Sequence, residues 1–278
     1  MRILVTNDDG IESIGLHKLA RALVPLGDVV IGAPDREFSG AGAAVGALHL
    51  IRPEMVRHHI EGIEEAWALN GPPALCALFA RLGAFGDPFD LVVSGINPGA
   101  NVGRSVYHSG TIGAAITARN GGISGIAISQ DVPGGGIEGQ AWDEMVLNMK
   151  WDTAASVAHT VVEAHLASPP DHPVALNVNV PDCELAQVKG WRRTELALMP
   201  MRSFVQAERK AKPGYEDTFV LDYEYGDRIE LPGHTDAGAV AAGYVSLTWL
   251  SRILPSLDED DAPIGSAIDE LLGRPTGT

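Results

Sequence analysis

Two adjacent carboxylates, Asp8 and Asp9, stand near the start of the sequence in the motif N-D-D-G, directly after a short apolar run. Asp and Gly readily form turns, so the motif alone is compatible with an ordinary turn after a strand. The alternative is a cation site, because carboxylate, amide and hydroxyl oxygens are hard donors that suit Mg²⁺, Mn²⁺ or Ca²⁺. Ser39 and Asn97 supply the hydroxyl and the amide in two later polar stretches. Taken with them, the two acids favour the cation site over the turn.

A second candidate for chemistry is S-G-T at Ser109, Gly110 and Thr111, which immediately precedes a predicted helix at 112–119. Free backbone N–H groups and the helix dipole favour an anion such as phosphate at this point, and the two hydroxyls add donors. The alternative is that Ser109 or Thr111 caps the helix and does nothing more. The phosphate interpretation therefore depends on a cation site nearby.

Several other sites are excluded by spacing. Asp8 and Asp9 are adjacent, whereas aspartyl-phosphate phosphatases need D-x-D-G. Gly40, Gly42 and Gly46 come near the dinucleotide fingerprint but have one residue too many before the last glycine. The two cysteines in the chain are too far apart for a CxxC zinc site or a disulfide framework.

The elements that must position these groups follow an α/β pattern. Short apolar runs alternate with segments of helical period, which predicts a parallel sheet covered by helices. The predicted strands are 3–6, 28–32, 91–94, 125–129 and 174–180, and the predicted helices are 16–23, 74–82, 112–119 and 154–167. Polar clusters follow the strands at 3–6, 28–32 and 91–94. Ligands in such sheets bind beyond the carboxyl ends of the strands, so these clusters are expected to converge.

After residue 181 the pattern changes to predicted strands at 191–198, 218–224 and 244–248, with no helix between the first two. We therefore expect an α/β domain over 1–188, a β-rich extension over 189–254, and a C-terminal helix and tail over 255–278.

Composition narrows the function classes. The formal net charge of −16 argues against a nucleic-acid polymer as partner, because such a surface needs a basic stripe. No apolar run reaches the roughly 18 residues that a membrane-spanning helix requires. The apolar run at 1–5 is too short for a signal peptide. We expect a cytoplasmic protein that does not bind membranes.

Together these motifs resemble the SurE family of survival-protein nucleotidases. The motifs that carry the resemblance are N-D-D-G at 7–10, A-P-D-R at 33–36 with S-G at 39–40, S-G-I-N at 94–97 with Asn101, S-G-T at 109–111, N-V-N-V-P at 177–181, T-D at 235–236 and G-Y-V-S-L-T at 243–248. The resemblance thus covers about residues 1–250.

The resemblance implies a metal-dependent 5'-nucleotidase that hydrolyses nucleoside 5'- and 3'-monophosphates, with short-chain polyphosphate as a further substrate. It implies a Rossmann-like three-layer α/β/α sandwich whose C-terminal extension mediates homodimers or homotetramers. One Mg²⁺ or Mn²⁺ per subunit is expected. The residues carried over by position are the metal ligands Asp8, Asp9, Ser39 and Asn97, of which Asp8 or Asp9 acts on the water, and the phosphate-binding residues Asn101, Ser109, Gly110 and Thr111.

The chain departs from the family at a few positions. Family members usually have G-T-P-x-D-C where this chain has G-P-P-A-L-C at 71–76, and Phe38 and His108 also differ from the usual residues. These departures leave two alternatives open. One is a phosphatase specialised for another small phosphate ester, and the other is a non-catalytic protein that binds nucleotide or metal.

Overall fold

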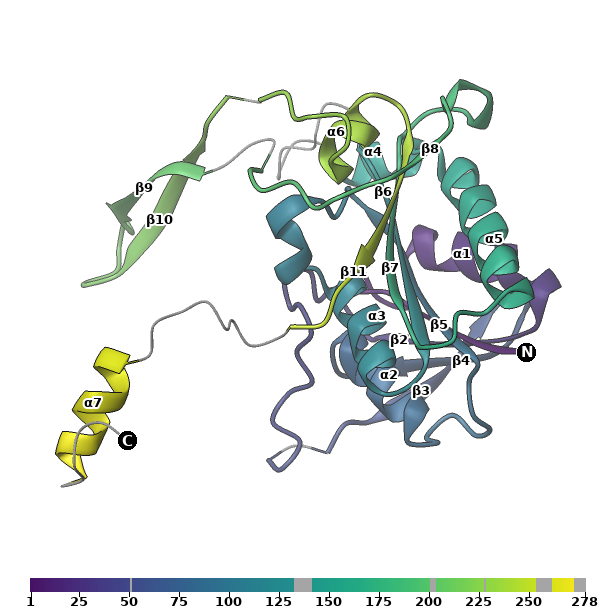
Figure 1. Cartoon of the computed structure of the whole chain (residues 1–278), viewed down its shortest axis with the longest axis horizontal. Helices are drawn as coiled ribbons and strands as arrows, with labels where there is room; N and C mark the ends of the chain where they lie inside the picture. Colours follow the sequence, from purple (N-terminus) through teal and green to yellow (C-terminus); the bar gives the residue numbers. More distant parts are fainter. Residues whose placement is uncertain (51, 133–141, 201–203, 228, 254–261, 273–278) are drawn as a thin grey trace.

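The central element of the fold is a nine-stranded sheet in the order β3-β4-β2-β1-β5-β6-β7-β11-β8 (Figure 1). The computed structural model describes residues 1–50, 52–132, 142–200, 204–227, 229–253 and 262–272. The strands of this sheet are β1 (Arg2–Thr6), β2 (Asp28–Pro34), β3 (Met55–Ile60), β4 (Ile63–Leu69), β5 (Leu91–Pro98), β6 (Ser124–Gln130), β7 (Ala175–Val180), β8 (Trp191–Arg193) and β11 (Val245–Leu250).

The middle of the sheet is parallel. β4, β2, β1, β5, β6 and β7 pair in parallel, whereas β3 and β11 run antiparallel to β4 and β7. The central strands are buried along almost their whole length because helices cover both faces, which explains why they read in the sequence as continuous apolar runs. The five strands predicted for the α/β domain are all present.

Helices cover the sheet on two sides. α1 (Ile14–Leu23) and α5 (Trp151–Ala167) pack on one face, and α2 (Pro73–Arg81) and α3 (Gly110–Asn120) pack on the other. The alternation of β1 shows the two layers, because Ile3 and Val5 join the cluster with α1 and α5, whereas Leu4 joins the cluster with α2 and α3. The expected three-layer α/β/α arrangement is confirmed.

Smaller helices complete the fold. They are α4 (Trp142–Asn148), α6 (Asp236–Ala241), α7 (Ala262–Leu271) and the 3₁₀ turns Val24–Leu26, Gly103–Tyr107 and Leu185–Gln187. Among the helices that the structure describes, none combines the length and the apolar character needed to cross a membrane.

The predicted extension 189–254 contributes to two different structures. β8 and β11 complete the main sheet, whereas β9 (Phe204–Ala211) and β10 (Phe219–Tyr225) form a separate antiparallel hairpin. The hairpin and α7 both project away from the body of the molecule (Figure 1). The strand predicted over 191–198 ends at Arg193, because the chain then turns toward α6, where Ala197 N–H donates to the Asp236 carboxylate.

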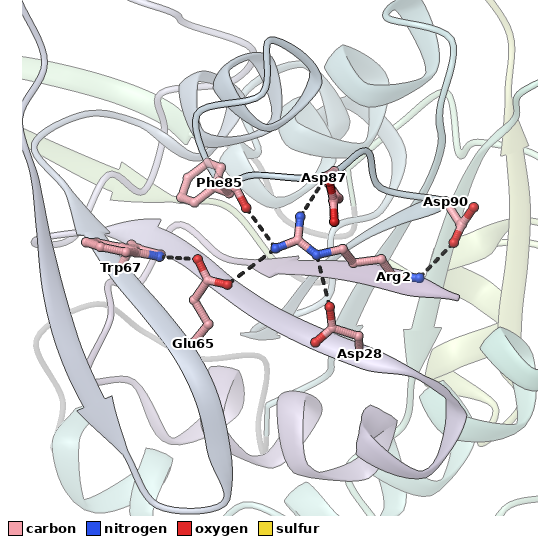
Figure 2. Close-up of polar contacts among 7 residues, drawn as sticks. All are labelled: Arg2, Asp28, Glu65, Trp67, Phe85, Asp87 and Asp90. Atoms are coloured by element: carbon pink, nitrogen blue, oxygen red, sulfur yellow. Dashed lines mark hydrogen bonds and ion pairs between the residues drawn. The ribbon is translucent and has the colours of Figure 1, made fainter.

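The amino ends of the parallel strands are joined by one arginine (Figure 2). Arg2 Nε donates to Asp28 Oδ2 at 3.0 Å, and Nη2 reaches both Glu65 Oε2 at 3.3 Å and the Phe85 carbonyl at 2.7 Å. The Arg2 main-chain N–H donates to Asp90 Oδ2 at 2.7 Å. We refer to this group as the Arg2 cluster, which comprises Arg2, Asp28, Glu65, Trp67, Phe85, Asp87 and Asp90.

Candidate active site

The N-D-D-G motif forms a tight turn between β1 and α1. The Asn7 side-chain amide donates to the Gly10 carbonyl at 3.1 Å and to Ser13 Oγ at 2.6 Å, and Ser13 caps α1 by accepting from Leu16 N–H. Gly10 has φ of +102°, a region that side chains with a Cβ rarely adopt. The motif is therefore a turn, as the simpler interpretation predicts, and the turn places Asp8 and Asp9 at the carboxyl edge of the sheet, where Asp8 is buried and Asp9 is partly exposed.

Asp8 joins the end of β1 to the start of α3. Its side chain is only 3% exposed; Oδ1 accepts from Thr111 Oγ1 at 2.5 Å, and Oδ2 accepts from Gly110 N–H at 3.1 Å. A Cβ at position 110 would lie 2.8 Å from the Asp8 Cβ and Oδ2 atoms, so this approach requires glycine. The first metal-ligand candidate and the predicted phosphate turn therefore lie in direct contact.

The start of α3 is capped by a serine, and a carboxylate of the protein lies at its N-terminus. Ser109 Oγ accepts from Ile112 N–H at 3.1 Å, as the capping interpretation predicts. The anion at this N-terminus in the described structure is the Asp8 carboxylate, which receives donors from both Gly110 and Thr111. Because a serine hydroxyl that accepts one bond still carries its own O–H donor, the cap leaves Ser109 able to donate to a ligand.

The loop after β2 lies against the same turn. Phe38 N–H donates to the Asp8 carbonyl at 2.7 Å, which fixes the backbone beside residue 39 next to the N-D-D-G turn. Ser39 itself is exposed. The structure thus brings Ser39 to the carboxyl edge of β1 and β2, with its hydroxyl open to solvent.

Asn97 and Asn101 stand beyond the other neighbour of β1. Asn97 is partly exposed near the end of β5, opposite Ser129 of β6, and its amide nitrogen donates to the Gly99 carbonyl at 2.6 Å. That bond leaves the Asn97 amide oxygen, the atom a metal would use, out of the contact. The Asn101 amide nitrogen donates to Ser129 Oγ at 2.9 Å.

Burial and the absence of a cationic side chain beside them, among the described residues, make the charged form of the two acids unfavourable. Burial raises the pKa of Asp8. The pKa of Asp9 is raised well above its ordinary value, first by burial and then by the negative charges of Asp8 and Glu37. Neither acid takes part in an ion pair within the part of the chain that the structure describes. The donor chemistry fits a hard divalent cation, which would neutralise this charge.

Two further observations bear on the metal. The Asn7 Oδ1 atom is buried without a hydrogen-bond partner in the described structure, so this corner holds more acceptors than donors. No group of three or more His, Cys, Asp or Glu side chains suited to a metal occurs among the described residues. The donors that the candidate residues offer are carboxylate, amide and hydroxyl oxygens, and such donors suit hard divalent cations.

The sequence alone assigned no role to Asn177, Asn179 or Asp236. The structure places all three against the loop that bears Asn101. A signal was present in the N-V-N spacing, because two asparagines separated by one residue on a strand point to the same face.

The fold is a doubly wound α/β protein, and its candidate site residues lie beyond the carboxyl ends of β1 and its neighbours, the edge at which ligands bind in such folds. The chain belongs to the SurE family, since the family model described as survival protein SurE matches residues 3–202. The family resemblance drawn from the motifs is thereby confirmed.

Relatives and a solved structure support the same assignment. The chain is 37% identical to the 5'-nucleotidase SurE of Acinetobacter baylyi, over 89% of this chain and 92% of that protein. It is 33% identical to the protein of the same name from Synechococcus sp., over 90% of this chain and 91% of the relative. The crystal structure of the SurE protein from Aquifex aeolicus matches with a TM-score of 0.71 and 29% identity, over 98% of this chain and 100% of that one.

Proposed function

We propose that this protein is a divalent-metal-dependent 5'-nucleotidase that hydrolyses nucleoside 5'-monophosphates to nucleoside and phosphate. The observation that carries the proposal is the direct bond between the Asp8 carboxylate and the S-G-T turn at the start of α3. This bond places a group of hard oxygen acceptors, which suit a metal ion, beside a helix N-terminus, which suits a phosphate. Binding a phosphate ester through a metal requires both. The names of the relatives agree with this activity. Nucleoside 3'-monophosphates and short-chain polyphosphate are further proposed substrates.

In the proposed site, Asp8, Asp9, Ser39 and Asn97 hold one Mg²⁺ or Mn²⁺. When bound, the cation neutralises phosphate charge and polarises a phosphoryl oxygen and a water molecule. The outer donors of the site are Asn101, with a second N–H on its amide, and Ser109, with its hydroxyl. Gly110 and Thr111 act on the phosphate side by orienting Asp8.

Asp8 and Asp9 have different roles in the proposed site. Both oxygens of Asp8 already accept hydrogen bonds, from Gly110 and Thr111, so Asp8 serves as a fixed ligand. The Asp9 side chain is held less firmly, since its Oδ2 accepts from the Asn7 amide at the long distance of 3.5 Å. Asp9 therefore keeps an oxygen for the attacking water, which it orients for in-line displacement.

The test is a phosphate-release screen on the full chain, with nucleoside 5'- and 3'-monophosphates, polyphosphate and sugar phosphates, each with Mg²⁺, Mn²⁺ or EDTA. We expect the highest kcat/KM on a nucleoside 5'-monophosphate and complete loss with EDTA. A clear preference for a sugar phosphate would instead support the specialised phosphatase suggested by the altered 71–76 stretch. Tight nucleotide binding without phosphate release under any metal would indicate a binding protein and refute the proposal.

The projecting elements supply a proposed route to self-association. The hairpin β9–β10 exposes apolar side chains, with Val205 62% and Leu221 68% exposed, and α7 exposes Ile264, Ile268 and Leu271. Exposed apolar surface of this kind is typical of an interface. We expect a homodimer or homotetramer by light scattering, and a smaller species when Val205 and Leu221 are both replaced by lysine. A wild-type monomer at micromolar concentration would contradict this. The cytoplasmic location stays a prediction.

A further inference from the structure

We propose that Asn179, together with Asn177 and Asp236, positions Asn101 for phosphate by holding the main chain of its loop. This inference rests on the proposed function, in which Asn101 donates to the phosphate. The three residues bond to the main chain of the loop and not to the Asn101 side chain, so they are positioning residues rather than catalytic ones. They belong to two motifs, N-V-N-V-P and T-D, that contribute no residue to the proposed metal and phosphate sites.

The first anchor is the carboxyl half of β7. Asn179 holds both polar groups of the Asn101 main chain, because its Oδ1 accepts from Asn101 N–H at 2.8 Å and its Nδ2 donates to the Asn101 carbonyl at 3.1 Å. The Asn177 amide donates to the same carbonyl at 2.8 Å. Both asparagines are fully buried. The main chain of Asn101 thus forms three hydrogen bonds with side chains of β7.

The second anchor lies two residues further along the loop. Asp236, at the start of α6, is fully buried, and its Oδ2 accepts from Gly103 N–H at 2.8 Å. Its other oxygen accepts from Ala197 N–H at 2.9 Å and from Ala237 N–H at 2.8 Å. Gly103 has φ of +54°, and a Cβ there would lie 2.9 Å from the Ala197 carbonyl oxygen. The loop is therefore pressed closely onto the segment that Asp236 organises.

The result is a loop whose conformation is set by buried side chains rather than by its own sequence. With its main chain fixed at residues 101 and 103, the Asn101 side chain is directed to Ser129 Oγ, 2.9 Å away on β6. Donors that are held in place before the ligand arrives lose little freedom on binding, which favours affinity and alignment. Loosening the loop should therefore weaken phosphate binding and leave the cation site at Asp8 and Asp9 intact.

The direct test is amide hydrogen exchange of the full chain without substrate. In the wild type, Asn101 and Gly103 N–H should exchange slowly, because buried side chains accept from them. In Asn179→Ala, the exchange rate of the Asn101 N–H should increase at least about tenfold. In Asp236→Asn, the increase should occur at the Gly103 N–H, because an amide N–H₂ would face this donor. Ser246→Ala is the matched control, since Ser246 is buried opposite Asn179 on β11 and bonds to Thr194, not to the loop.

The functional test compares the same variants by kinetics and by binding. For Asn179→Ala we expect KM for the nucleotide, and the dissociation constant for inorganic phosphate with Mg²⁺ present, to rise about tenfold, while kcat changes less than about threefold. Asn177→Ala, which leaves the Asn179 bond to the same carbonyl, should raise KM about threefold. Mn²⁺ affinity, measured by calorimetry without nucleotide, should stay within about twofold of wild type in all of them.

The outcomes separate the two proposals. Unchanged exchange at Asn101 in Asn179→Ala, or unchanged phosphate affinity despite faster exchange, would overturn the positioning role. If the wild type hydrolyses no nucleotide, the proposed function fails, but exchange and inorganic-phosphate binding still decide the role of the three residues. Should Asn179→Ala not fold, Asp236→Asn and Asn177→Ala give the same readouts at milder cost.

Discussion

The two ends of the parallel strands hold acidic side chains under opposite conditions. At the amino ends, Asp28, Glu65 and Asp90 surround Arg2, which brings a fixed positive charge and a planar set of donors (Figure 2). At the carboxyl ends, Asp8 and Asp9 stand side by side and form no ion pair among the described residues. The first group finds its cation within the chain, whereas for the second we propose a cation from solution.

The difference shows how burial and charge distinguish a structural site from a functional one. Burial raises the pKa of Asp8, and burial together with the negative charges of Asp8 and Glu37 raises the pKa of Asp9 well above its ordinary value. Perturbed acids in an exposed edge of an α/β sheet are typical of ligand sites. The same residue type thus forms ion pairs within the fold at one edge, whereas at the other its proposed role is ligand binding.

The largest expected effect separates the two edges by activity. Asp8→Asn removes one negative charge from the metal site and should lower kcat/KM at least about a thousandfold, while the folded structure is kept. The matched control is Asp90→Asn at the opposite edge, which should leave kcat/KM within about twofold. Steady-state phosphate release at saturating Mn²⁺ measures both. Near wild-type activity of Asp8→Asn would mean that the two edges do not differ in this way.

The next effect is on stability and lies at the other edge. Arg2→Met keeps much of the side-chain length but removes the guanidinium that donates to the Phe85 carbonyl, Asp28 and Glu65. The free energy of unfolding should fall by about 2 kcal/mol, most of it from the partly buried Phe85 carbonyl, because the acids remain partly solvated. Urea unfolding followed by circular dichroism would show the change, and kcat at low temperature should not move. An unaltered midpoint would show that the Arg2 cluster adds no stability.

A third prediction concerns the binding of the proposed cation. At a Mn²⁺ concentration about ten times its dissociation constant, binding should stabilise the wild type by about 1.4 kcal/mol and raise Tm by about 4 °C. The rise should disappear in Asp8→Asn and persist in Arg2→Met. Differential scanning calorimetry with and without EDTA tests this, and an equal rise in Asp8→Asn would place the cation elsewhere.

The smallest effect concerns a buried group that needs no cation. Burial raises the pKa of the Cys76 thiol to about 12, so it stays protonated through the range in which the protein is handled. Iodoacetamide at pH 8 should therefore label Cys76 only after unfolding in urea, with the thiolate gained only as the pH approaches that value. Cys183 is partly exposed and serves as the internal comparison in mass spectrometry. Rapid native labelling of Cys76 would show that its surroundings open.

The sequence predicted the central strands of the sheet better than it predicted the edges. The runs around Val5, Val93 and Ile128 are buried on both faces, so their apolar character alone identifies them. The edge strand β3 reads M-V-R-H-H-I and is largely exposed, so no buried face leaves a pattern in its sequence. β9 was missed for the same reason, because its charged residues lie on a hairpin without a core of its own.

The sequence identified candidate site residues by their type, but it could not show which of them contact one another. Thr111 was expected beside a phosphate, yet its hydroxyl bonds to Asp8, which lies more than a hundred positions earlier in the chain. Nothing in the spacing of the two motifs states that β1 and the start of α3 meet, since this follows from the strand order. The roles of Asn179 and Asp236 were out of reach for the same reason.

The bond between Asp8 and Thr111 also has a consequence for synthesis on the ribosome. Asp8 leaves the exit tunnel early, but β5 and the start of α3, which complete its surroundings, are translated about a hundred residues later. Domains fold as units during translation, so a nascent chain that stops before Thr111 carries the two acids without their donors. The hydrogen bonds that fix the Asp8 carboxylate therefore form only late in synthesis, once the start of α3 has been translated.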